Sequence, residues 1–258
     1  MNLRYKTRND KQFRFKSSNG IQHILSIDIF SSALERTHKI IDQIDSFEVN
    51  IAEVLGMRNL SAFLGELYVA SLAKESKGFL LKNPHQDGYP YLLIMDDNGQ
   101  KILAEIKSHN GMKEKRPFSP FANGGLEVKA TCGSVPTPAQ CGKKGLEKPE
   151  IGDQRIKFVK GYDWKAHHRE TNNLVGLFWD FINNKPRIVA VFFCAELDEA
   201  DWGKIIKPKD GGGRTTSVSI MSRDGVKKMF NSWVLVIDDD RYKNFLNDYN
   251  GLKLLYEA

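Results

Sequence analysis

The residues with the clearest chemistry lie between Gly124 and Thr131. After two glycines, apolar and charged side chains alternate, and the acid Glu127 stands two positions before Lys129. A period of two is typical of a β-strand, whose side chains point to opposite faces in turn, so the two charged groups would share a face about 7 Å apart. A carboxylate and an ammonium at this spacing, beside a water and a divalent metal ion, make half of a site for phosphodiester hydrolysis.

The other half of such a site needs a second acid from elsewhere in the chain. Residues 83–90 are rich in Asn, Pro, Asp and Gly, which is turn chemistry, and they carry Asp87. Because this turn precedes a short apolar run that predicts a buried strand, Asp87 is the first acid to consider as a partner for Glu127.

A second copy of the Glu-x-Lys triplet leaves the assignment open. The Asp-Asn-Gly turn signal at 97–99 predicts that residues 101–107 run back as the second strand of a β-hairpin. That strand would carry Glu105 and Lys107, and Asp87 could pair with them instead. We favour the later triplet because glycines open its strand and a basic loop follows it; Glu105 is then an additional acid near the site.

Apolar residues at helical spacing predict two helices, over residues 24–56 and over residues 59–78. Glu66 lies on the second helix, one position off the apolar stripe, as a surface residue or as an additional acid delivered to the site. Two apolar runs around an Asn-Asn-Lys-Pro turn predict a central β-hairpin. The remaining predicted elements are that hairpin's strands at 174–181 and 187–193, a strand at 233–237, a last helix at 241–246 and a loop at 132–152.

Together these elements predict an α/β (α+β) fold with a central mixed β-sheet flanked by helices. With 258 residues and no clean linker, the chain is expected to form one domain, residues 1–258, with a basic N-terminal arm over residues 1–20. The net charge of +6 favours an anionic partner. The three cysteines show no zinc spacing, and no apolar run reaches membrane-spanning length, so we expect a cytoplasmic protein with reduced thiols.

Several donor-rich segments are candidate DNA contacts. They lie in the basic loop, in a polar stretch around two adjacent histidines, and after a glycine cluster. The candidates are Lys143, Lys144, His167, His168, Arg169, Arg214 and Thr215. The glycine cluster lacks the GxxxxGK[ST] order of a phosphate-binding loop, so we expect no nucleotide cofactor.

A helix is followed by the Asp87 turn, a hairpin and the Glu-Val-Lys strand, and this order resembles the core of the PD-(D/E)XK nuclease superfamily over roughly residues 59–131. The Glu-Val-Lys-Ala-Thr strand resembles that of type II restriction endonucleases. This resemblance implies a restriction-endonuclease-like core in which Asp87 and Glu127 hold Mg²⁺. Lys129 would position or deprotonate the attacking water.

The chain departs from that family at one position. The family's Pro-Asp pair aligns most naturally with Pro90-Tyr91, and a neutral tyrosine is a poor ligand for Mg²⁺, which prefers carboxylate oxygens. Asp87, in the turn just before, is the nearest substitute. Lys129, beside Glu127, is expected to stay protonated and to orient the water more than to act as a base.

The resemblance implies a type II site-specific deoxyribonuclease of a bacterial or archaeal restriction system, which hydrolyses double-stranded DNA with Mg²⁺. Cleavage of a symmetric site implies a homodimer, because a twofold protein matches a palindrome. Two alternatives stay open: a structure-specific repair or recombination nuclease of the same fold, and a non-catalytic basic DNA-binding protein.

Overall fold

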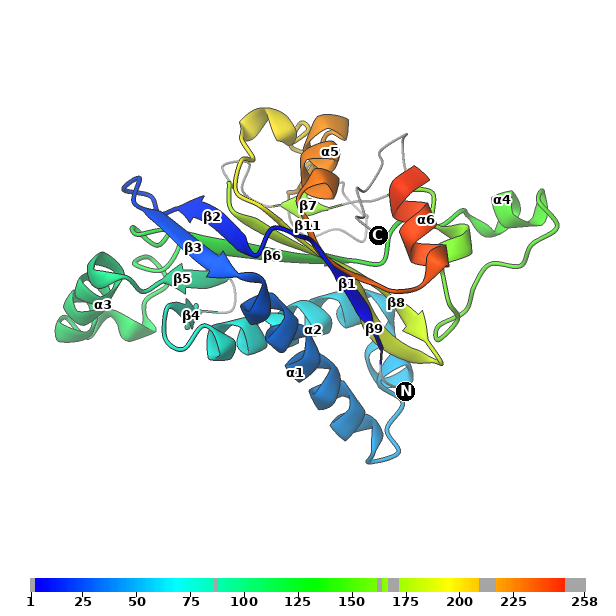
Figure 1. Cartoon of the computed structure of the whole chain (residues 1–258), viewed down its shortest axis with the longest axis horizontal. Coiled ribbons are helices and arrows are strands. Elements are labelled where there is room, and N and C mark those ends of the chain that lie inside the picture. The colour runs from blue at the N-terminus through cyan, green and yellow to red at the C-terminus, as the bar shows by residue number, and fades with distance from the viewer. Residues whose placement is uncertain (1–2, 86–87, 162–163, 167–171, 209–216, 249–258) are drawn as a thin grey trace.

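The fold is that of a computed structural model, which describes residues 3–85, 88–161, 164–166, 172–208 and 217–248. Within these residues, seven strands form one central sheet (Figure 1). In spatial order the strands are β1 (Tyr5–Thr7), β11 (Trp233–Ile237), β9 (Lys185–Cys194), β8 (Leu174–Ile182), β6 (Gly125–Thr131), β5 (Leu92–Ile94) and β4 (Leu80–Lys82).

The sheet is mixed. Strands β6 and β8 run parallel, and the other neighbouring pairs are antiparallel. Strands β8 and β9 form the predicted central hairpin, whose turn places Asn183 and Asn184 at φ values of 52° and 60°. Asparagine tolerates this left-handed conformation, which two-residue hairpin turns require. The strands predicted at 174–181, 187–193 and 233–237 are thus confirmed.

Helices cover both faces of the sheet (Figure 1). The long α1 and α2 lie on one face, over a core that includes Leu126 and Val128 of β6, and α5 and α6 lie on the other face over a second core. The helices are α1 (Ile27–Asp45), α2 (Ile51–Glu75), α3 (Asp97–Ser108), α4 (Pro138–Gly142), α5 (Arg223–Asn231) and α6 (Asp240–Asp248). The predicted mixed sheet flanked by helices is therefore confirmed.

The first two helices begin and end differently from the prediction. Residues 22–26 form a strand, and the chain then enters α1, so the predicted helix over 24–56 is wrong at both ends. The side chain of Asn50 accepts hydrogen bonds from two backbone N–H groups of the next turn and begins α2 there. Gly56, at φ 62° and ψ 167°, interrupts the helical geometry, and the predicted helix over 59–78 is the remainder of α2.

The predicted hairpin after β5 is wrong, because residues 97–108 form helix α3. The Asp96 side chain accepts a hydrogen bond from the backbone N–H of Gly99 at 2.9 Å and so caps the helix. The Asp-Asn-Gly sequence is therefore the first turn of a helix rather than a hairpin turn. Glu105 and Lys107 lie on α3, and both are exposed.

The N-terminal segment is built into the fold rather than forming an arm. Strand β1 pairs with β11, and β2 (Gln12–Lys16) and β3 (Gln22–Ser26) form a two-stranded antiparallel ribbon. Phe13 and Phe15, on one face of this ribbon, are buried in the first core. Of the basic residues of the segment, Lys6, Arg14 and Lys16 thus stand on strands.

The remaining short elements are two-residue strands and single turns. The loop predicted over 132–152 contains α4, which Thr137 begins with a reciprocal capping box to Gln140. The other short elements are β7 (Lys165–Ala166), β10 (Ser219–Ile220) and the 3₁₀ turns Gly111–Lys113, Ile156–Phe158 and Glu199–Asp201. In the described part of the chain, no helix combines the length and apolar character needed to cross a membrane.

Candidate active site

Strand β6 carries Glu127 and Lys129 on one face, as the alternation predicted. Their neighbours in the parallel strand β8 are Leu174 and Gly176, which belong to the α5 side of the sheet. The alternate β6 residues Leu126 and Val128 point into the opposite core, beneath α1 and α2. The sequence pattern therefore separates the charged pair from the main apolar core.

The two charged side chains are in direct contact. The Lys129 Nζ lies 2.6 Å from Glu127 Oε1, and the backbone N–H of Tyr91 donates to Glu127 Oε2 at 3.3 Å. The side chains of Glu127 and Lys129 are 6% and 16% exposed. Both carboxylate oxygens thus have partners, and the pair lies largely out of water, where its interaction is stronger than on the surface.

Tyr91 completes the immediate surroundings of this pair. It precedes β5, and the register of β5 against β6, with Leu92 opposite Leu126, brings it beside Glu127. Its ring centroid lies 4.8 Å from the Lys129 Nζ, which is a cation–π contact. The tyrosine at the position where the resemblance expects an acid therefore holds the lysine with its ring and Glu127 with its backbone. The sequence showed the tyrosine but not this contact, which depends on strand register.

The surroundings of Lys129 decide its charge. Burial alone would favour the neutral amine, but Glu127, Tyr91 and Glu66 act electrostatically on the ammonium and raise the pKa of Lys129 above its ordinary value. At neutral pH the side chain is therefore an ammonium. It can donate hydrogen bonds and stabilise negative charge, but it carries no lone pair with which to accept a proton.

Glu66 lies on α2, close enough to act electrostatically on Lys129. Its carboxylate forms an ion pair with Lys82 of β4 at 2.5 Å. The side chains of Glu66 and Lys82 are 31% and 43% exposed, so this pair is accessible to solvent. This position matches the interpretation of Glu66 as a surface residue, and its role as an additional acid stays a prediction.

The turn expected to supply the second acid is held at both ends. The Asn83 side chain donates to the carbonyl oxygens of Pro90 and Phe118, both at 2.9 Å. Gly88 packs so closely against Asn83 that a Cβ there would lie 2.4 Å from the amide oxygen. Asp87 itself lies outside the described residues, so its distance from Glu127 is not part of this geometry.

Within the described residues, no three His, Cys, Asp or Glu side chains converge to hold a metal ion. Among the residues that the structure describes, Glu127 is the carboxylate in contact with Lys129, and both of its oxygens are engaged. A magnesium site here therefore needs at least one further ligand. Carboxylate oxygens suit the hard Mg²⁺ ion, so Glu127 fits as one ligand.

The predicted DNA contacts are placed only in part. Lys143 and Lys144 are exposed where α4 ends, in the excursion that follows β6. The other predicted contacts, His167, His168, Arg169, Arg214 and Thr215, lie outside the described residues. Glu105, the predicted additional acid, is exposed on α3, and within the described part of the chain it forms no ion pair with Lys129.

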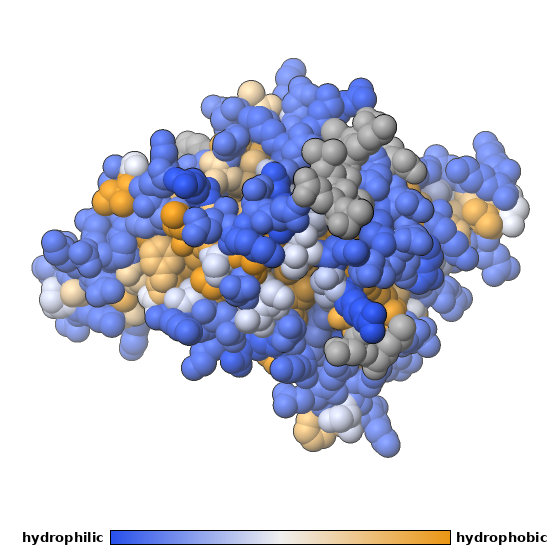
Figure 2. Space-filling view, viewed as in Figure 1, coloured by the Kyte–Doolittle hydropathy of each residue, from blue (hydrophilic) through white to orange (hydrophobic). Residues whose placement is uncertain are grey.

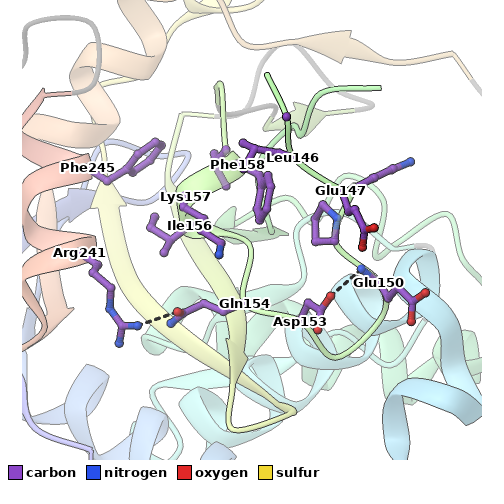
Figure 3. A pocket seen from close by; sticks show the side chains of 14 residues that line it. Leu146, Glu147, Glu150, Asp153, Gln154, Ile156, Lys157, Phe158, Arg241 and Phe245 are labelled. Atoms are coloured by element: carbon purple, nitrogen blue, oxygen red, sulfur yellow. Dashed lines mark hydrogen bonds between the residues drawn. The ribbon is translucent and has the colours of Figure 1, made fainter. Parts of the chain in front are cut away.

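A large groove lies away from this pair, between the segment 145–159 and helix α6 (Figure 3). Its volume is about 1030 Å³, and Leu146, Ile156, Phe158 and Phe245 give it an apolar wall. In Figure 3 Arg241 points toward Gln154, and its Nη1 donates to Gln154 Oε1 at 2.7 Å.

The acids that line this groove are exposed, and one of them, Asp153, accepts a hydrogen bond from the Glu150 backbone N–H and so closes a turn. The groove and the buried contact between Glu127 and Lys129 are therefore two separate candidates for a functional site. We take the contact between Glu127 and Lys129 as the candidate active site, because burial gives these charges chemical strength that exposed groups lack.

Comparison with known protein families, with curated proteins and with solved structures found no match for this chain.

Proposed function

We propose that the chain is a Mg²⁺-dependent endonuclease with a restriction-endonuclease-like core, which hydrolyses phosphodiester bonds of double-stranded DNA at specific sites. The observation that carries the proposal is the contact between Glu127 and Lys129, buried on one face of β6. The turn whose sequence contains Asp87 leads into β5, the strand that pairs with β6. The net charge of +6 supports a polyanionic substrate.

In this reaction Lys129 donates hydrogen bonds from its ammonium to the attacking water or to a phosphate oxygen, and it stabilises the negative charge that develops there. Tyr91 limits where that ammonium can go, because its ring covers one side of Nζ. Glu127 supplies a carboxylate for the metal, and Asp87 is the proposed second ligand. Mg²⁺, when bound, neutralises charge on the phosphate and lowers the pKa of a bound water.

The second candidate function is a basic DNA-binding protein without catalysis. The direct contact between Glu127 and Lys129 favours this function. A purely structural ion pair would also show an ammonium nitrogen 2.6 Å from a carboxylate oxygen. A nuclease that reads DNA structure instead of sequence is the remaining alternative within enzymes. The restriction-type proposal adds a homodimer, matched to a symmetric DNA site.

Cleavage of supercoiled plasmid DNA separates these functions. The purified chain is incubated with plasmid and Mg²⁺, with EDTA in place of Mg²⁺, and as the Glu127→Gln variant with Mg²⁺. We expect discrete fragments only with the unaltered chain and Mg²⁺. A smear indicates a nuclease without sequence specificity, and DNA binding without cleavage in Mg²⁺ or Mn²⁺ rules out the enzyme and leaves the binding protein.

A further inference from the structure

The β2–β3 ribbon has one face buried and one face open to solvent. Along β2 the exposed residues are Gln12, Arg14 and Lys16, alternating with the buried phenylalanines. The register places Ile24 of β3 opposite Arg14, and Gln22 opposite Lys16. The outer face of the ribbon, defined by these five residues, therefore combines two cations, two amides and one apolar side chain.

The charge of the ribbon has one sign. Residues 11–26 contain Lys11, Arg14 and Lys16 and no acid. Among the described residues none of these three cations forms an ion pair. Ile21 and Ile24 are 50% and 46% exposed, and Figure 2 shows an apolar patch at the tip of the ribbon among hydrophilic atoms. Unpaired cations beside exposed apolar groups are suited to a polyanion that also offers apolar contacts.

The turn of the ribbon contacts the segment that leads into β6, the strand that carries the candidate active site; Figure 1 shows β2 and β3 beside this end of β6. At its turn, the Ser18 backbone N–H donates to Asn123 O at 3.2 Å, and Gly124 has no room for a Cβ beside Ser18. The Asn173 side chain bridges the Lys16 and Gly125 carbonyl oxygens at 2.9 and 3.2 Å. These bonds fix the ribbon against the start of β6, two residues before Glu127.

The dimensions of the ribbon select one groove of DNA. Paired strands lie about 4.8 Å apart, and their side chains extend the width further. The major groove of B-DNA is about 12 Å wide and admits a two-stranded ribbon, whereas the minor groove is about 6 Å wide. The major groove also displays donors and acceptors that distinguish all four base pairs.

From these observations we infer that the outer face of the β2–β3 ribbon enters the major groove of duplex DNA and reads bases next to the cleaved bond. The inference rests on the proposed function for its partner. Arg14 has the paired donors that match guanine, and Gln22 has the donor and acceptor that match adenine. Ile24 offers an apolar contact for the thymine methyl group, and Lys16 contacts phosphate.

The test uses the full chain with Ca²⁺ in place of Mg²⁺ and a pool of short duplexes with a randomised centre. Duplexes that the unaltered chain retains are sequenced and resynthesised with a fluorescent label for anisotropy. We expect the Arg14→Ala/Gln22→Ala variant to bind the selected duplex about 10-fold or more weakly, with a smaller change for the unselected pool. Lys16→Ala should weaken binding to both duplexes alike.

The matched control is Lys39→Ala, which removes an exposed cation from α1. All variants should keep the unfolding midpoint of the unaltered chain, because the substituted side chains are exposed. Methylation of guanine N7 by dimethyl sulfate gives a second readout, since N7 lies in the major groove; the unaltered chain should protect it and the double variant should not. If the double variant binds the selected duplex as the unaltered chain does, the ribbon inference is wrong and the proposed function stands. If the unaltered chain retains no duplex, both are wrong.

Discussion

Two triplets of the chain, Glu127-Val128-Lys129 on β6 and Glu105-Ile106-Lys107 on α3, differ only in their central residue, yet the structure gives them different chemistry. On the strand, the outer two side chains share a face and meet at 2.6 Å. On the helix, residues two apart are rotated by about 200° around the axis and point away from each other. The helical pair is exposed and has no mutual ion pair among the described residues.

The difference shows that the backbone period, and not the residue types, makes this acid–lysine pair. In a strand, which repeats every two residues, the Glu and Lys of a Glu-x-Lys triplet lie on the same face. In a helix, which repeats every 3.6 residues, they lie on different faces. Burial then strengthens the interaction between the two charges, because their side chains are largely removed from solvent. The helical triplet thus serves as an internal control for every substitution in the strand triplet.

The largest effect on stability should come from breaking the buried pair. Lys129→Met leaves the Glu127 carboxylate buried without its cation, and we expect the free energy of unfolding to fall by about 3 kcal/mol. Lys107→Met should change it by less than about 0.5 kcal/mol. Urea unfolding of the two variants measures both values. Adding Glu127→Gln to Lys129→Met should recover part of the loss, and equal effects of the two lysine substitutions would contradict the comparison.

The contact with Tyr91 has no counterpart on α3. Tyr91→Leu removes the ring from beside the Lys129 ammonium, and a partly desolvated cation–π contact contributes about 1–2 kcal/mol. We therefore expect Tyr91→Leu to lower the free energy of unfolding by about that amount and Tyr91→Phe, which keeps the ring, to cost less. Thermal or urea unfolding distinguishes the two. If Tyr91→Phe is as destabilising as Tyr91→Leu, the hydroxyl and not the ring holds the lysine.

The pH dependence of stability should reveal the ammonium of Lys129. Because its surroundings raise the pKa of Lys129 in the folded chain, its contribution is complete below the ordinary lysine pKa of about 10.4 and is lost as the pH rises through the higher folded pKa. The difference in unfolding free energy between the unaltered chain and Lys129→Met should accordingly shrink at alkaline pH. A difference that grows with pH would contradict this assignment, and Lys107→Met reports the effect of substitution alone.

The smallest effect is expected on α3. Lys107 lies in the last turn of this helix, where a cation interacts favourably with the helix dipole. Lys107→Glu should therefore cost about 0.5 kcal/mol, and added salt should reduce this cost because the site is exposed. Urea unfolding at low and high salt measures the change. A cost similar to that of Lys129→Met would mean that the helical triplet has contacts comparable to those on β6.

Strands that show either an alternating pattern or a continuous apolar run could be predicted from the sequence. The alternation in Leu126-Glu127-Val128-Lys129 and the apolar runs of β8, β9 and β11 predicted strands that the structure contains. The same alternation in Gln-Phe-Arg-Phe-Lys at 12–16 forms a strand, although the basic composition of residues 1–20 predicts an arm, because burial of the two phenylalanines holds this segment on the core.

Features that depend on long-range geometry could not be predicted. Whether Asp96 caps a helix or the following residues turn a hairpin depends on packing around α3, since Asn123 from the start of β6 also donates to Asp96 at 2.7 Å. The approach of Tyr91 to Lys129 requires the register of β5 against β6, which the residues of neither strand specify alone. The sequence therefore predicts only the strand that carries Glu127 and Lys129. The contact of this pair with Tyr91 depends on the three-dimensional fold.

The central claim, that the strand triplet is catalytic and the helical triplet is not, is tested most directly by comparing Glu127→Gln with Glu105→Gln in plasmid cleavage with Mg²⁺. Both substitutions remove one charge and keep the size of the side chain. We predict that Glu127→Gln lowers the cleavage rate by about 10³-fold and leaves DNA binding in place, whereas Glu105→Gln stays within about twofold of the unaltered chain. Equal rates for the two variants, or loss of cleavage in Glu105→Gln alone, would contradict the account.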